Sequence, residues 1–387
     1  MKAYSKYNQI VICATLIGVL GIGLFNLIID PFGILGSPAI AGLNQEKPKE
    51  ASHVRLFKAV DVVRIKPKAV FIGTSGVEYG LNPDHPSLAN YQPVYNLGLP
   101  DSNAYEQLRY LEHAIANQPD LEVVVLGLDF VSYNHKNVTE VDFYEDRLGQ
   151  DHVVVSDLLK VILSIDALEA SIETVTENTD EGTGFPYYSN GTRNEEYFNS
   201  NKPTIDIFQE YLKTYLHRSE LYGQFSLSPE MLDSLKAIVD LCEKHDIELK
   251  VFISPFHASH LEAIQAANLW SVFEDWKRQV AEIIPIWDFS VYNFVTAETI
   301  SDDMHYFRDG AHYREEVGNL ILNCILQSQG EEICSPQPQG QNIPEAFGVW
   351  VTPDNIATHL EQIRSDRERW VAQNPAIVEM VQELKAD

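Results

Sequence analysis

The chain has 387 residues, of which 45% are hydrophobic and 22% are charged. Such a composition can build a buried core, so a disordered chain is not expected. With 28 Lys and Arg against 56 Asp and Glu, the formal net charge is −28. This charge repels nucleic acid phosphates and anionic headgroups, so no nucleic-acid partner is expected, and we interpret the acidity mainly as a solvated surface.

An uncharged apolar run covers residues 10–29 and ends at Asp30. At about 1.5 Å per residue, the run is roughly as long as a hydrocarbon core is thick. Lys2 and Lys6 precede it, so the positive-inside rule places residues 1–9 in the cytoplasm and the bulk of the chain outside, in the periplasm or extracellular space.

A cleaved signal peptide is the alternative interpretation of this run, supported by Ala39-Ile40-Ala41. Signal peptides usually have an apolar region of about 7–15 residues, and the run here is longer and lies well before that cleavage site. This favours an uncleaved transmembrane anchor, and both interpretations export the remaining chain. A buried core helix would have to be apolar on every face.

Two of the four cysteines, Cys324 and Cys334, flank the end of a predicted helix. They could form a short-loop disulfide in an oxidising compartment, and buried free thiols are the alternative. No Cys-x-x-Cys spacing of the metal-binding type occurs in the chain.

From about residue 51 to residue 329, apolar strands alternate with helical patterns, which is typical of a parallel sheet covered on both faces. We therefore predict a three-layer α/β domain over residues 30–330. The predicted strands are Ala69–Ile72, Val94–Leu97, Val123–Leu128, Leu249–Ile253 and Ile284–Trp287. The predicted helices include Ala104–Asn117, Pro229–His245, Leu261–Ile283 and Arg314–Gln327.

Residues 132–222 interrupt this alternation and are interpreted as an insertion of the kind that builds binding loops. The insertion contains a helical stretch around 157–174, an acidic loop at 177–182 and an aromatic loop at 184–191. The aromatic side chains could stack on sugar rings or form a satellite core. Residues 331–387 are expected to form a linker, containing Pro336, Pro338 and Gly340, and a helical extension at Pro353–Leu384.

The sequence Gly73-Thr74-Ser75 follows the strand at 69–72 directly, which places Ser75 at the carboxyl end of the sheet. The first amides of the next helix are unpaired there and can hold an oxyanion. A serine hydroxyl becomes a nucleophile only with a base, and the base needs an orienting partner. Alternatively, Ser75 is only a helix N-cap.

Asp309 and His312 supply such a pair near the end of the predicted domain. Their spacing of three places them on one face of a helical turn, where the carboxylate can orient the imidazole. The alternative is that Asp309 caps a helix and His312 is a surface histidine. Each motif is weak alone, and their combination predicts a Ser-His-Asp site.

Together these segments resemble the SGNH (GDSL-type) hydrolase superfamily. The chain looks closest to the membrane-anchored branch related to the alginate O-acetylation and D-alanyl-transfer proteins. The resemblance spans about residues 69–322 and is carried, in order, by Gly73-Thr74-Ser75, Asn96-Leu97-Gly98, Gly127-Leu128-Asp129 and Asp309-Gly310-Ala311-His312.

The resemblance implies a flavodoxin-like three-layer fold with no metal or organic cofactor. It also implies that Ser75 is the nucleophile, His312 the general base and Asp309 its orienting partner. The implied oxyanion donors are the backbone amides of Ser75 and Gly98.

Asp129 departs from the family pattern, which usually has an Asn as a third oxyanion donor. An ionised carboxylate only accepts hydrogen bonds, and its charge would oppose a developing oxyanion. Asp129 therefore stays protonated, points elsewhere to hold a loop residue such as Tyr133 or His135, or marks a weakened hydrolase.

Two functions are compatible with these features. The first is a serine esterase or O-acyltransferase that acts on an envelope or extracellular polysaccharide through an acyl-serine. The second is a non-catalytic, membrane-anchored subunit that uses the same cleft to bind glycan or to dock on a membrane acyltransferase partner. The expected partners are a carbohydrate or acylated glycan and the membrane.

Further candidate substrate contacts are His257, Arg193 and Tyr187 of the aromatic loop. For His257 the alternative is a loop cap, for Arg193 a surface arginine and for Tyr187 a core residue. A metal site is a less favoured possibility because no second cluster completes the coordination. Its ligands would come from Asp302, Asp303, His305, Asp309 and His312.

Overall fold

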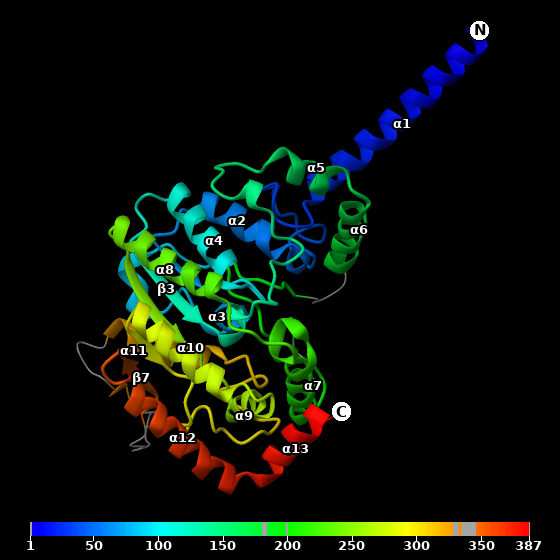
Figure 1. Ribbon diagram of the computed structural model, residues 1–387. Helices are drawn as coiled ribbons and strands as arrows, with labels where there is room; N and C mark the ends of the chain where they lie inside the picture. The colour runs from blue at the N-terminus through cyan, green and yellow to red at the C-terminus, as the bar shows by residue number, and fades with distance from the viewer. Residues whose placement is uncertain (1, 180–183, 199, 328–332, 335–345, 387) are drawn as a thin grey trace.

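The computed structural model describes residues 2–179, 184–198, 200–327, 333–334 and 346–386. Helix α1 (Lys2–Ile29) projects away from a body that contains the rest of the described chain (Figure 1). Its residues Tyr4–Ile29 form a helix long and apolar enough to cross a membrane.

A seven-stranded sheet lies at the centre of the body, in the order β2-β1-β3-β4-β5-β7-β6. The first five strands in this order are parallel, and β7 and β6 are antiparallel to their neighbours. The strands are β1 (Ala69–Ile72), β2 (Val94–Asn96), β3 (Val123–Leu128), β4 (Glu248–Ile253), β5 (Ile286–Asp288), β6 (Ile333–Cys334) and β7 (Gly348–Val351). The chain therefore moves outward from β1 to β2 and then returns to the other side of β1, so the order reverses between β1 and β3.

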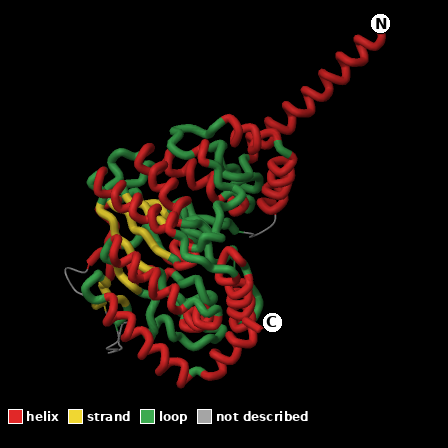
Figure 2. Tube along the Cα trace, in the orientation of Figure 1, coloured by secondary structure: helices red, strands yellow, loops and turns green. Residues whose placement is uncertain are grey.

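Both faces of the sheet are buried. Val70 and Ile72 of β1 enter one apolar cluster, whereas Ala69 and Phe71 enter a second. Successive side chains of a strand point to opposite faces, so the continuous apolar strands fill two cores. The strands accordingly run among helices in Figure 2.

Different helices contribute to the two cores. The first core receives apolar residues of α2 (Val54–Ile65), α4 (Ala104–Asn117), α8 (Pro229–Lys244), α9 (Ala258–Ala266) and α10 (Trp270–Ile283). The second receives those of α3 (Ser75–Gly80) and α11 (Glu315–Gln327).

The parallel sheet and most of its elements agree with the sequence-based prediction. Strands 69–72 and 123–128 and helix 104–117 have the predicted bounds. The single helix expected over 261–283 is wrong, because α9 and α10 are separated by Asn268 in the left-handed region, with φ of 60°. A continuous right-handed helix cannot include that conformation.

The insertion at 132–222 forms helices α5 (Val155–Leu163), α6 (Ile165–Thr179) and α7 (Thr204–His217). One helical stretch was predicted, where the structure has α5 and α6, and α7 was not predicted. Residues 180–182 of the expected acidic loop lie outside the described residues.

The C-terminal segment is more than the expected extension. Strand β7 pairs with β5 and so completes the main sheet. Helices α12 (Ile356–Gln373) and α13 (Pro375–Ala386) then run along the body and end beside α7, where His217 Nε2 lies 2.8 Å from the Leu384 carbonyl (Figure 1). The expected linker at 335–345 lies outside the described residues.

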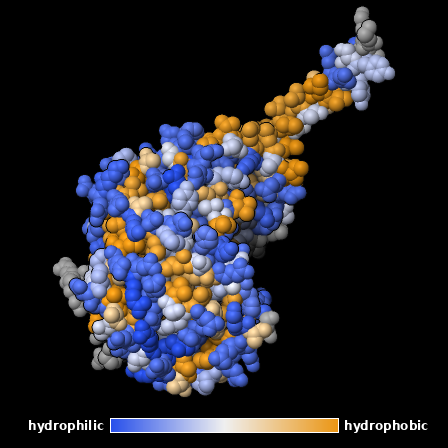
Figure 3. Space-filling model, viewed as in Figure 1, coloured by the Kyte–Doolittle hydropathy of each residue, from blue (hydrophilic) through white to orange (hydrophobic). Residues whose placement is uncertain are grey.

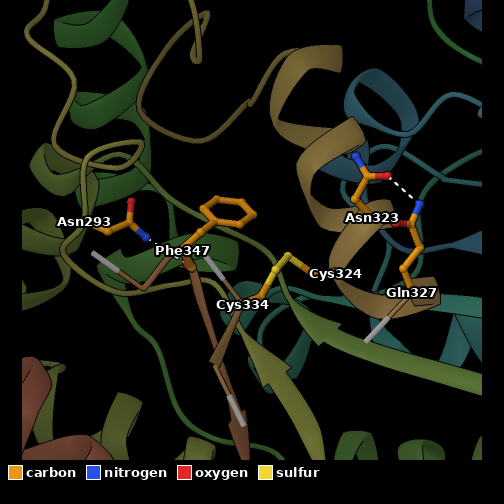
Figure 4. The surroundings of a disulfide bond; sticks show 6 residues. All are labelled: Asn293, Asn323, Cys324, Gln327, Cys334 and Phe347. Atoms are coloured by element: carbon orange, nitrogen blue, oxygen red, sulfur yellow. Dashed lines mark hydrogen bonds between the residues drawn. A yellow bond between two sulfur atoms is a disulfide. The ribbon is translucent and has the colours of Figure 1, made fainter. Parts of the chain in front are cut away.

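A disulfide links Cys324 of α11 to Cys334 of β6, with 5.8 Å between the Cα atoms (Figure 4). It joins the helix that follows His312 to the added antiparallel edge of the sheet. Of the two alternatives for these cysteines, the structure contains the disulfide, and Cys13 and Cys242 are free.

Candidate active site

Ser75 is the first residue of α3, directly after the turn that follows β1. Thr74 is the N-cap, and its hydroxyl oxygen lies 3.4 Å from the amide of Gly76. The turn needs glycine at position 73, because a Cβ there would lie 2.9 Å from the carbonyl oxygen of Gly127 in β3. Ser75 is thus held at the carboxyl end of the sheet where the strand order reverses, the usual position of ligand sites in open α/β sheets.

Ser75, His312 and Asp309 form one continuous chain of hydrogen bonds. Ser75 Oγ lies 2.8 Å from His312 Nε2. His312 Nδ1 lies 2.8 Å from Asp309 Oδ2. The tautomer that fits both contacts carries its proton on Nδ1, which leaves Nε2 free to accept the proton of the serine hydroxyl.

Asp309 is fixed by three groups of its own turn. Its Oδ1 accepts hydrogen bonds from the amides of Ala311 and His312, at 2.8 and 2.9 Å. Burial alone would raise the pKa of Asp309, but the His312 imidazole and these amides outweigh burial and lower the pKa. The carboxylate therefore stays ionised and holds the imidazole in place.

The hydroxyl of Ser75 is accessible from a cavity of about 940 Å³. Its walls include Ser75, His312, Tyr79 and Tyr211, and also Asp157 and Lys160 of α5. A second cavity of about 600 Å³ reaches His312 and Asp309 from the side of α7. The reacting groups thus lie where two hollows meet.

Two tyrosine rings flank the imidazole of His312. The Tyr79 and Tyr211 rings lie edge-on to it, with ring centroids at 5.3 and 5.4 Å. Burial raises the pKa of both phenols, that of Tyr211 to about 12. Both rings therefore stay neutral around the base.

Arginines surround the second cavity. Arg193 and Arg308 lie over the Tyr79 ring, at 4.8 and 4.4 Å from its centroid, and Arg314 pairs with Glu195. In each of these three arginines, one buried guanidinium nitrogen has no hydrogen-bond partner within the described part of the chain. These nitrogens are Arg193 Nε, Arg308 Nη1 and Arg314 Nε. Carboxylates balance part of this positive charge, because Arg193 pairs with Glu78 and both Arg308 and Arg314 pair with Glu195.

Asp129 does not contact Tyr133 or His135 through a hydrogen bond. Its Oδ2 accepts a hydrogen bond from the hydroxyl of Thr74, the residue before Ser75. Burial raises the pKa of Asp129, although the Thr74 hydrogen bond opposes this rise. Asp129 therefore holds the turn that carries Ser75, and its environment favours the protonated form.

The amide of Gly98 is already engaged. It donates to Asn96 Oδ1 at 3.0 Å, while the Gly98 carbonyl accepts from Lys58 Nζ at 2.6 Å. Lys58 in turn forms a fully buried ion pair with Glu78. Because this network occupies Gly98, the geometry does not support the expected role of its amide as an oxyanion donor. As the first residue of α3, Ser75 has no helical carbonyl partner for its amide.

The three weaker site predictions have different outcomes. His257 is buried outside both cavities and caps α9, where its Nδ1 accepts from the Ser259 amide at 3.1 Å. The expected substrate contact of His257 is therefore not supported. Arg193 lines both cavities and is not a simple surface residue, because it pairs with buried Glu78 at 3.3 Å.

Tyr187 is 6% exposed and belongs to the first core, packed on Phe57, yet it also contributes to the larger cavity wall. Of the residues considered for the less favoured metal site, Asp309 and His312 bind each other, whereas Asp302 accepts from the Thr204 amide. Among the described residues, no group of three such side chains is placed to hold a metal ion.

Sequence reasoning missed Tyr211 and Arg308. Tyr211 comes from α7, a helix that was not predicted, so nothing placed it near His312. Arg308 immediately precedes Asp309, and this adjacency to the Asp-x-x-His motif was the available signal.

No protein-family model matches this chain, and a search of curated proteins finds no match either.

Proposed function

We propose that this protein is a membrane-anchored serine esterase or O-acyltransferase of the SGNH type, which acts on an acylated envelope or extracellular polysaccharide. The single observation that carries the proposal is the hydrogen-bonded chain from Asp309 through His312 to Ser75 at the wall of a cavity. The parallel strand order β2-β1-β3-β4-β5 supports a flavodoxin-like three-layer fold. The apolar helix α1 and the disulfide support an anchored, extracytoplasmic protein.

The proposed reaction has two steps. In the first, Ser75 Oγ attacks the acyl carbonyl while His312 Nε2 takes the hydroxyl proton, and the donor alcohol then leaves with that proton. In the second, His312 deprotonates water or a sugar hydroxyl, which attacks the acyl-serine and releases Ser75 with its proton restored. Asp309 stabilises the imidazolium formed in each step, and the Ser75 amide faces the oxyanion.

The arginines around the second cavity favour binding of an acceptor that carries carboxylate or similar anionic groups. Arg193, Arg308 and Arg314 all line this cavity, and planar guanidinium groups suit carboxylates. The exposed ring of Tyr211 offers a surface on which a sugar can stack.

The alternative, a non-catalytic glycan-binding subunit, would use the same cavities. It does not require an imidazole oriented by a buried carboxylate toward an accessible serine. The hydrogen-bond chain therefore favours catalysis.

Hydrolysis of a small acetyl ester by the full-length protein tests the proposal. Ser75→Ala and His312→Ala are each expected to lower kcat by roughly 10³-fold or more, because each removes a member of the hydrogen-bonded chain. Lys236→Gln, an exposed substitution on α8 outside both cavities, serves as the control. Wild-type rates in Ser75→Ala would overturn the proposal.

A further inference from the structure

The end of α1 is fixed firmly to the body. Asn44 Nδ2 donates to the carbonyl of Ile28 at 2.9 Å, and Lys47 Nζ donates to that of Ile29 at 2.8 Å. The carboxylate of Asp30 accepts from four successive amides of the following turn, those of residues 34–37. The carbonyls at the end of α1 thus have partners in the body, so the direction of α1 sets the orientation of the body.

Helix α5 packs directly on the last turns of α1. Asn26 Nδ2 donates to the carbonyl of Ile162 at 2.9 Å. A Cβ on Gly23 would lie 3.1 Å from the side chain of Leu163, so glycine at this position allows the two helices to approach closely. Helix α5 therefore lies beside α1 and not beyond its end.

Large apolar side chains are exposed around this junction. On α5, Val155, Leu159 and Leu163 are 68%, 53% and 45% exposed, and Ile165 at the start of α6 is 76% exposed. The first three are spaced by four and share one helix face. Figure 3 shows hydrophobic surface along α1 that continues onto the body where α1 emerges. We name these four side chains the junction face.

The depth of α5 follows from helix geometry. Gly23 precedes Ile29 by six residues, which is about 9 Å along the helix. If the apolar run of α1 spans the hydrocarbon core, the C-terminal end of α5 lies about 5–10 Å inside the boundary between acyl chains and headgroups, the depth at which amphipathic helices lie. We propose that α5 and the start of α6 lie in the membrane interface on the side of the body, with the junction face in contact with lipid.

The charges of α5 are compatible with the boundary between lipid and water, where an exposed lysine can extend its ammonium toward the headgroups. Its two charged residues are Asp157, buried in a pair with Arg147, and Lys160, whose ammonium lies 3.8 Å from the centroid of the Tyr144 ring. The junction face itself is uncharged, although the whole chain carries a net charge of −28. An apolar face that is continuous with a membrane span is expected to meet the same bilayer.

This placement also bears on the reaction, a consequence that rests on the proposed function. The cavity that contains Ser75 is also lined by Tyr144, Asp157 and Lys160, and the last two belong to α5. With α5 in the interface, that part of the cavity lies at the membrane surface. An acyl group supplied by a membrane-embedded donor could then reach Ser75 from the bilayer side.

Fluorescence quenching of the full chain in phosphatidylcholine nanodiscs tests the proposal. An environment-sensitive probe is attached to Leu159→Cys or Val155→Cys in a Cys13→Ser background, and native Cys13 is labelled separately as a marker of α1. Lys236→Cys on α8, which bears an exposed lysine in the native chain, is the control position. We expect doxyl-labelled lipid to quench the probes at 159, 155 and 13 several-fold more than the probe at 236.

The outcomes separate the membrane placement from the anchor and from catalysis. The proposal would be overturned if doxyl-labelled lipid quenched the probe at 13 while only aqueous iodide quenched the probes at 159 and 155. The junction face would then be a surface for a protein partner. Absence of lipid quenching at all positions would overturn both the anchor and the proposal. The same quenching is expected in Ser75→Ala, because contact between the junction face and lipid does not depend on catalysis at Ser75.

Discussion

His312 Nε2 lies 2.8 Å from Ser75 Oγ, although 237 positions separate the two residues in the chain. Close contact between the helices that follow them holds them together. A Cβ on Gly318 of α11 would lie 1.7 Å from the carbonyl oxygen of Gly80 in α3. The distance between nucleophile and base thus depends on a glycine in the second core.

Gly318→Ala is therefore expected to push α11 away from α3. Overpacking of this kind costs about 1–3 kcal/mol of unfolding free energy, and the shift should also lower kcat by weakening the contact between Ser75 and His312. Chemical denaturation and ester hydrolysis measure the two effects. Gly21→Ala is the control, because nothing lies within 4 Å of a Cβ at that position. Equal stability of both variants would contradict the packing argument.

Asp309→Asn is expected to lower kcat by roughly 10²–10⁴-fold while the protein stays folded, because an amide no longer holds the required imidazole tautomer. The His312 imidazole and two amides lower the pKa of Asp309 despite burial, so the carboxylate is ionised from pH 5 to 8. The large loss of kcat should therefore be found throughout this range. A variant that approaches the wild-type rate at either end would argue against an ionised Asp309.

Asp129→Asn introduces the residue that is usual at this position in the SGNH hydrolases, which the sequence resembles. Burial raises the pKa of Asp129, so the wild-type side chain is neutral below this pKa and gains a negative charge as the pH rises through it. That charge disfavours a nearby oxyanion, whereas the amide stays neutral and can still accept from Thr74. The ratio of Asp129→Asn to wild-type kcat should rise with pH. A ratio that falls with pH would show that ionised Asp129 assists the reaction.

Loss of the disulfide should destabilise the protein without disturbing the site. Cys324 and Cys334 are 10 positions apart, and closing a loop of this size stabilises the folded state by about 3 kcal/mol. Chemical denaturation of Cys324→Ser/Cys334→Ser should show this loss, and reductant should bring the wild type to the same value. An oxidised wild type no more stable than the double variant would contradict the prediction.

The sequence predicted the parts of this structure that depend on local pattern. The apolar run at 123–128 favoured an interior strand over a half-solvated one. The spacing of three predicted the contact between Asp309 and His312, although the two residues lie in the loop before α11 and not on the expected helical turn. Their hydrogen bond, and that to Ser75, agree with the predicted Ser-His-Asp site, although the catalytic role stays a prediction.

Features that depend on competition between partners were not predictable in this way. Neither periodicity nor spacing shows that the Asn96 side chain occupies the Gly98 amide, or that Asp129 turns toward Thr74. Tyr211 reaches His312 from an insertion whose helices have no βαβ period. Strand β7 follows a long segment after α11, so its pairing with β5 had no local signal.

The proposed reaction requires Ser75 to be an activated nucleophile. A fluorophosphonate probe reacts with such serines, and peptide mass spectrometry locates the adduct. Full-length protein should carry the probe on Ser75, with labelling lost in Ser75→Ala and strongly reduced in His312→Ala. A folded wild-type protein that remains unlabelled at Ser75 would contradict the role of Ser75 as a nucleophile.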